Sequence, residues 1–245
     1  VLTLADFGYV QGGTFAMTGI KIAGLTSQGT LKLDGNALLV DDFVSVAKIN
    51  AGKLVFQGAQ NGNGTAYDSF KFKVMDNRPT NNEDPTPNTI TINVTAVNDA
   101  PVQTTAGAIA TVNEDSASTA AVALWSTAPV YAAGPGNEAS QTLSYKINTI
   151  PSFITLFKAD GTTAVTTGTT LTAAEFAGLK YKTVGNTNGT GTITFDVIDS
   201  GSVTAPSVNT LSGQSVTMTV NAVNDAPVLS DTTLTLTAVK QDAAV

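Results

Sequence analysis

The heptapeptide Ala-Val-Asn-Asp-Ala-Pro-Val occurs twice in this chain, at Ala96–Val102 and again at Ala222–Val228, 126 positions apart. Each copy follows a run in which apolar and polar residues alternate, at residues 89–95 and 215–221. Such alternation is typical of a half-buried β-strand. An identical segment at so long a period indicates repeated modules, each ending in a strand. Repeated modules usually provide length, spacing or multivalency, so a single catalytic centre is not expected.

Strand signals dominate the whole chain, and no long segment keeps an apolar period of 3.6 residues. Asp-Gly and Asn-Gly turns separate the strands. The alternation predicts strands in the first module at 1–4, 17–23, 30–33, 53–56, 67–75 and 88–97. In the second module it predicts them at 107–112, 119–125, 141–148, 153–157, 179–182, 191–198 and 214–223. Segments 44–51 and 172–178 are each expected to form one helical turn. About seven short strands per module predict an all-β fold of antiparallel sandwiches.

Composition excludes several classes of function. The net charge is −7 and the pI is near 4.4, so no basic patch is available for nucleic acid, whereas cations could bind. The chain has no Cys and no His, which removes disulfides, thiolate metal sites, Ser-His-Asp catalysis and the usual zinc sites. No apolar run approaches the roughly 20 residues of a membrane-spanning helix.

Three pairs of adjacent carboxylates were considered as catalytic groups: Asp41/Asp42, Glu83/Asp84 and Glu114/Asp115. Adjacent residues on a strand point to opposite faces, so these pairs do not converge. We therefore expect no enzymatic activity. Matched aromatic residues Phe72 and Phe195 are expected to face the cores of their modules. Trp125 is also expected in a core. A carbohydrate site would need an exposed aromatic ring beside polar loop groups, and Tyr131 is the better candidate for that ring.

The ends of the chain do not coincide with the ends of modules. Residues 228–242 parallel the segment that follows Pro101, whereas residues 1–4 parallel 121–124. The predicted domains are therefore 1–98, a sandwich without its first strand; 99–224, a complete sandwich; and 225–245, the first strand of a following module or a donor strand for a neighbouring chain. One interpretation is a fragment of a longer protein cut between two strands.

The other interpretation is assembly, in which one copy's tail completes the next copy's sheet. Leu234, Leu236 and Ala238 alternate with Thr and match the missing element. We predict that Leu234 and Leu236 insert into the first module of a neighbouring copy, head to tail.

The junction Ala-Val-Asn-Asp-Ala-Pro resembles the cadherin inter-domain junction, Asp-x-Asn-Asp-x-x-Pro. The patterns at 29–35, 49–56 and 67–76 look like the cadherin-like repeats of large bacterial surface adhesins, and they are similar to chondroitin-sulfate-proteoglycan repeats. The resemblance implies tandem Ig-like or cadherin-like β-sandwiches at a bacterial cell surface, forming an extracellular stalk or filament. The expected partners are copies of the chain or adjacent repeats, head to tail. The second hypothesis is a calcium-dependent module of an adhesin that binds glycans or another cell-surface partner.

The resemblance also implies calcium ligands. Glu114 follows Pro101 by the thirteen residues found in cadherins, which places it with Asn224 and Asp225 at the junction leaving the second module. Three features depart from the family: Ala96 and Ala222 replace the first Asp of the junction, no paired Asp motif lies near 124–130, and Gln241 stands where Glu114 would recur. The alternative is that Asn98 and Asp99 cap a tight turn through hydrogen bonds to the backbone. The predicted calcium ligands are Asn98, Asp99, Glu114, Asn224, Asp225 and Asp242.

Overall fold

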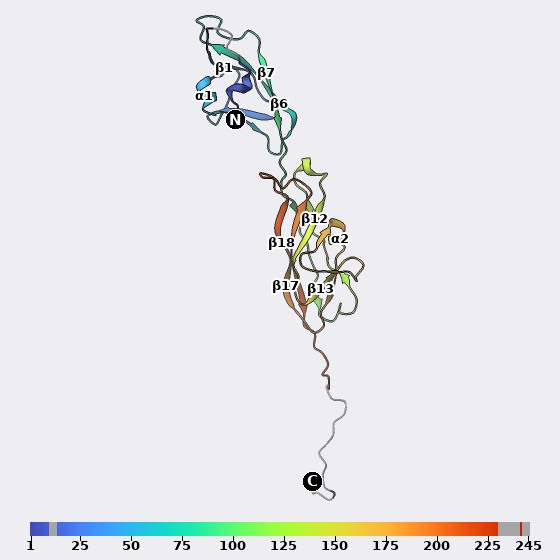
Figure 1. Ribbon diagram of the computed structural model, residues 1–245. Helices are drawn as coiled ribbons and strands as arrows, with labels where there is room; N and C mark the ends of the chain where they lie inside the picture. The colour runs from blue at the N-terminus through green and yellow to red at the C-terminus, as the bar shows by residue number, and fades with distance from the viewer. Residues whose placement is uncertain (10–13, 230–240, 242–245) are drawn as a thin grey trace. The chain divides into compact units, whose positions relative to one another are not determined.

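The computed structural model describes residues 1–9, 14–229 and Gln241 (Figure 1). The chain divides into two compact units. The first unit comprises Val1–Ala100 with the loops Ala133–Gln141 and Ser200–Asn209, and the second comprises Pro101–Ala132, Thr142–Asp199 and Thr210–Val245. Strands account for 44% of the residues and helices for 8%, and no helix reaches seven residues, which confirms the predicted all-β fold. No helix among the described residues is both long and apolar enough to cross a membrane.

The first unit contains two antiparallel sheets. One has the strand order β4-β1-β6-β7 and the other β3-β2-β5. Strand β7 lies at the end of its sheet, and β6 is its partner. The strands are β1 (Met17–Gly24), β2 (Gly29–Leu33), β3 (Asn36–Ala37), β4 (Phe43–Ser45), β5 (Leu54–Gly58), β6 (Gly64–Asp76) and β7 (Asn88–Val94). The short helices are η1 (Leu4–Phe7) and α1 (Val46–Asn50).

The alternating sequence of β6 places its aromatic residues in the first core. Phe70 and Phe72 are buried on one face, while the alternate residues Ser69 and Lys71 are exposed. Rings on one face of a strand pack against apolar residues of the facing sheet, and their burial is the main stabilising contribution of such a strand. The buried core of this unit is Phe7, Ile20, Ile22, Leu31, Leu38, Val44, Ile49, Leu54, Phe70 and Phe72.

The second unit has a similar architecture, with one more strand in each of the two corresponding sheets and an additional pair of strands. A five-stranded sheet has the order β15-β12-β17-β18-β9, a four-stranded sheet the order β10-β16-β13-β14, and β11 pairs with β8. The strands are β8 (Val102–Thr105), β9 (Val112–Asn113), β10 (Val122–Ala123), β11 (Val130–Ala132), β12 (Leu143–Thr149), β13 (Ile154–Phe157), β14 (Ala164–Val165), β15 (Thr170–Thr172), β16 (Lys180–Thr183), β17 (Gly189–Asp199) and β18 (Thr210–Asn221). The short helix of this unit is α2 (Ala173–Ala177), whereas η2 (Gly136–Glu138) lies in a loop of the first unit.

An aromatic cluster lies at the centre of the second core. The Phe195 ring lies 4.8 Å from that of Phe176, between ring centroids, and the Phe176 ring stacks on Tyr145 at 4.1 Å. Phe195 is fully buried and Phe72 is 3% exposed, so both predicted inward-facing positions are confirmed. Trp125 is partly buried against the same core and donates its indole N–H to the carbonyl of Phe176 at 2.8 Å, as expected for a core residue.

Three expectations from the sequence are wrong. No strand forms at Val1–Leu4, because the Asp6 carboxylate accepts hydrogen bonds from the backbone and hydroxyl of Thr3 and starts helix η1. The strand expected at 107–112 is absent apart from Val112, which begins β9, and an isolated bridge between Ala108 and Thr127. Tyr131 is not an exposed platform; it lies on β11, is 7% exposed and packs in the core.

Candidate functional site

Hydrogen bonds of Asn98 hold the first copy of the repeated heptapeptide in place. Its backbone N–H donates to the Ser207 hydroxyl at 3.1 Å, and its carbonyl accepts from the backbone of Val208 at 2.8 Å. Its side-chain amide donates to the carbonyl of Val208 at 2.8 Å and accepts from the Gln141 amide at 2.6 Å. A side chain at Gly201 would collide with the Asn98 amide. Asn98 therefore joins the junction segment to two loops of the first unit.

Glu138 is the most unusual carboxylate of this region. It is 4% exposed, and its Oε1 accepts a hydrogen bond from the backbone N–H of Asp99 at 3.0 Å. Its Oε2 is buried without a hydrogen-bond partner, and so is the side-chain oxygen of Gln141, one turn further on. Gly134 is required beside it, since any Cβ there would collide with Oε2.

The side-chain oxygens of Glu138 and Gln141 are buried hydrogen-bond acceptors that lack a donor. A buried acceptor that lacks a donor costs free energy, and in proteins such groups are usually satisfied by ordered water or by an ion. Calcium takes carboxylate, amide and carbonyl oxygens as ligands. The Glu138 and Gln141 oxygens are of the chemical types that calcium takes as ligands, and the sequence-based prediction included neither residue. The signal in the sequence was Gly134-Pro135-Gly136, which ends two positions before Glu138 and allows a close backbone approach.

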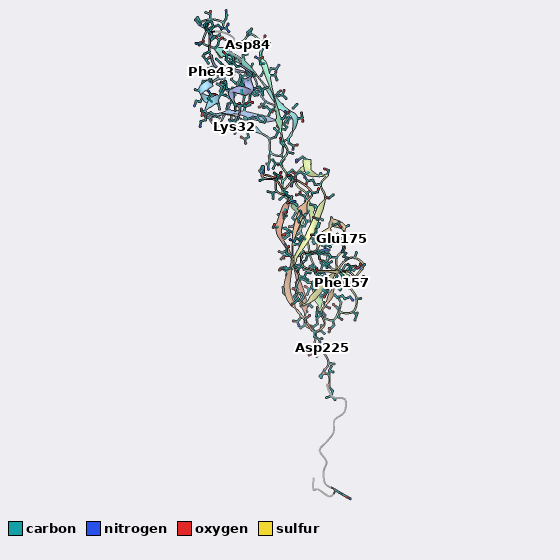
Figure 2. The ribbon with its side chains drawn as sticks, in the orientation of Figure 1. Lys32, Phe43, Asp84, Phe157, Glu175 and Asp225 are labelled. Atoms are coloured by element: carbon teal, nitrogen blue, oxygen red, sulfur yellow. The ribbon has the colours of Figure 1, made fainter. Side chains whose placement is uncertain are left out.

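At the second copy of the heptapeptide, the carboxylate that accepts a backbone hydrogen bond is that of Glu114 instead of Glu138. Glu114 is 3% exposed; its Oε1 accepts from the backbone N–H of Val223 at 2.8 Å, and its Oε2 accepts from the Asn188 amide at 3.4 Å. Asn224 and Asp225 are exposed beyond the end of β18 (Figure 2). Asn224 donates through its side chain to the carbonyl of Asp225 at 3.2 Å.

The predicted calcium ligands therefore fall at two places. Asn98 and Asp99 lie together in the first unit, and Glu114 contacts the junction segment that carries Asn224 and Asp225, as the spacing from Pro101 suggested. Asp242 lies outside the described residues. Across residues 1–9, 14–229 and 241, no three His, Cys, Asp or Glu side chains are grouped to hold a metal. Calcium binding remains a prediction, with Glu138 and Gln141 as added donors.

The adjacent acid pairs engage separate partners. Asp41 contacts the Lys21 ammonium at 2.9 Å, while Asp42 accepts from the backbone of Leu39 at 2.7 Å. Glu83 contacts Lys73 at 2.8 Å and Lys21 at 3.4 Å. These surface ion pairs link neighbouring strands, and pairs of this kind contribute little to stability individually.

Asp68 is a buried carboxylate with a structural role. It accepts backbone hydrogen bonds from Ser27, Gln28, Gly29 and Ser69 at 2.8–3.1 Å. Burial by itself would raise the pKa of this carboxyl, but the four N–H donors outweigh burial and lower the pKa below its ordinary value. Asp68 thus holds the turn that leads into β2 in its ionised form.

Strand β7 has one free edge. No described strand pairs with that edge, and a groove of about 430 Å³ runs beside it, lined by Val1, Leu2, Asp6 and residues 89–92. A second groove of about 370 Å³ continues along Ile92–Thr95 towards Phe56. An edge of this kind presents unpaired backbone groups to any incoming strand.

No protein-family model and no curated protein matches this chain.

Proposed function

We propose that this chain is a non-enzymatic structural segment of an extracellular repeat protein, serving as part of a stalk or filament of a bacterial surface adhesin. One observation carries the proposal. The same heptapeptide follows the last strand of each sandwich, β7 in the first unit and β18 in the second. A protein that repeats both a sandwich and the segment leaving it can extend by adding modules, and each added module increases length without requiring new chemistry.

The free edge of β7 supports assembly of copies head to tail. A contact between two different surfaces of the same molecule does not close on itself, so it propagates into a filament. The partner in this proposal is another copy of the chain, or the adjacent repeat of a longer polypeptide.

Sedimentation velocity and negative-stain microscopy test the proposal on the full chain and on a chain shortened by residues 229–245. We expect concentration-dependent linear assemblies from the full chain and monomers from the shortened one. Equal assembly by both chains would refute head-to-tail addition through the tail, and a compact closed oligomer would refute the filament.

The second candidate is a calcium-dependent module that binds glycans or a partner at the cell surface. The buried oxygens of Glu138 and Gln141 favour it, because bound calcium could order the loops that present a ligand site. Burial of Tyr131 removes the aromatic platform expected from the sequence. A glycan array read with calcium and with chelator tests this candidate, and reproducible calcium-dependent hits would favour it over a purely structural role.

A further inference from the structure

The two units differ at corresponding edges of their sheets. In the second unit, β18 lies between β17 and β9, and the pairing with β9 is parallel, with Val220 opposite Val112 and Asn221 opposite Asn113. The backbone N–H of Glu114 extends this pairing by donating to the carbonyl of Asn221 at 3.0 Å. In the first unit, β7 takes the place of β18, and the described residues contain no counterpart of β9.

Matched residues on β18 and β7 also differ in burial. Val216, Met218 and Val220 on β18 are 7%, 1% and 2% exposed. The residues at the same distances before the heptapeptide in the first unit are only half-buried: Ile90, Ile92 and Val94. Ile90 and Ile92 border the grooves beside the free edge of β7. The first unit therefore carries an apolar strip that its own described residues leave partly uncovered.

We propose that this strip binds residues 229–245 of a second copy as an added β-strand running parallel to β7. The proposal rests on the proposed function and specifies the contact through which copies would join. The occupant is indicated by the chain itself, because residues 228–242 follow the second heptapeptide as the segment containing β9 follows the first. Apart from Leu229 and Gln241, the tail lies outside the described residues, so its contribution is argued from sequence alone.

The pairing of β9 with β18 in the second unit predicts the register in which the tail would pair with β7. Ile109 and Val112 pack against the second core, and the alignment that places Gln241 at the position of Glu114 puts Leu236 and Val239 at these two positions. Val239 then lies beside Val94 as part of the added strand. Leu236 precedes the paired residues, as Ile109 precedes β9, and it covers Ile92 only because the regular strand begins after it. This differs from the expectation that Leu234 and Leu236 insert. Gln241 would offer a side-chain oxygen to the backbone of Val97, as Glu114 does to Val223.

Engineered cysteines give a direct test, because the chain has no Cys of its own. Thr95 is exposed and corresponds to Asn221, and Lys240 corresponds to Asn113, so the proposed register sets Thr95 opposite Lys240. One chain carries Thr95→Cys, and a second chain of different mass carries Lys240→Cys. The matched control replaces Lys240→Cys with Thr232→Cys, which lies eight residues earlier, or about 26 Å along an extended strand.

We expect a disulfide-linked heterodimer from the Thr95→Cys and Lys240→Cys chains, at least tenfold above the control pair. Equal yields from both pairs, or a higher yield from the control, would overturn the parallel register. Placing the two cysteines on separate chains ensures that a heterodimer reports only on contact between copies.

A second experiment, with a synthetic peptide, distinguishes failure of this inference from failure of the proposed function. A synthetic peptide of residues 229–245 should raise the melting temperature of a chain that lacks those residues, and a peptide carrying Leu236→Asp and Val239→Asp should not. If the full chain assembles but neither the peptide nor the cysteine pair shows the effect, the groove is not the joining site and the inference fails alone. If the full chain also stays monomeric at all concentrations, the proposed assembly fails with it.

Discussion

Replacing Phe195 with Ala tests the assigned strand register of the second unit most severely. The Phe195 side chain is fully buried, and its ring centroid lies 4.8 Å from Phe176, 6.2 Å from Tyr131 and 6.3 Å from Tyr145. Truncation of a buried Phe costs about 3–5 kcal/mol, and the cost rises when the surrounding groups cannot collapse into the cavity. Three rigid rings surround this position, so we expect the upper part of that range.

Phe72→Ala provides the matched change in the first unit. Its ring lies 5.0 Å from Phe7 and 6.2 Å from Phe70. The neighbouring Ile90 and Ile92 are only half-buried beside an open groove, so the site can relax more. We expect Phe72→Ala to cost less than Phe195→Ala, near 3 kcal/mol on the scale of buried Phe truncations.

The assay is urea unfolding followed by two probes. Trp125 is the only Trp in the chain and packs on the second core, so its fluorescence reports on the second unit, while circular dichroism reports on both units. Thr192→Ala is the control, because Thr192 is exposed on the opposite face of the strand that carries Phe195; its cost should stay within about 0.5 kcal/mol. A cost below about 1 kcal/mol for Phe195→Ala would refute the assigned register.

The remaining predictions concern charge and ions. Because the pKa of Asp68 is lowered in the folded chain, its stabilising contribution is complete above the unfolded value, about 3.9, and disappears as the pH falls through the lower folded value. Asp68→Asn should therefore cost roughly 1–3 kcal/mol at pH 7 and much less near pH 2 in urea titrations, and an equal cost at both pH values would contradict this. Millimolar calcium should raise the melting temperature of the full chain, because an ion bound only to the folded state stabilises it. Glu138→Gln should reduce that shift, and identical melting in calcium and chelator would rule out the site.

The central strands of both sandwiches could be predicted from sequence because their alternation is strong. The segments expected at 67–75 and 191–198 became β6 and β17, and the helical turns expected at 44–51 and 172–178 became α1 and α2. Ser45 and Thr172 begin these helices by accepting hydrogen bonds from the backbone at Lys48 and Glu175, a local signal that tertiary contacts did not override.

The residues that sequence reasoning missed depend on non-local contacts. Tyr131 stands two positions after Pro129 and precedes a Gly-rich loop, which suggests a surface position. Strand β11 nevertheless pairs with β8, and the Tyr131 ring packs in the core. Glu138 is in a loop with no apolar period, and its burial results from the contact with Asp99, 39 positions earlier in the chain. The segment 107–112 has strand-like residues, but Gly107 lies close to Pro129, Ala108 forms only an isolated bridge with Thr127, and strand β9 begins at Val112.

Hydrogen exchange of residues 88–95 is the measurement that tests the central claim most directly, since it reports on the backbone of β7 itself. It should be compared between the full chain under assembling conditions and the chain lacking residues 229–245. Pairing of the free edge predicts that exchange at some of these amides slows at least tenfold in the full chain, while exchange in β17, already paired on both sides, stays unchanged. Equal exchange of residues 88–95 in the two chains would show that the tail of a second copy does not complete this sheet.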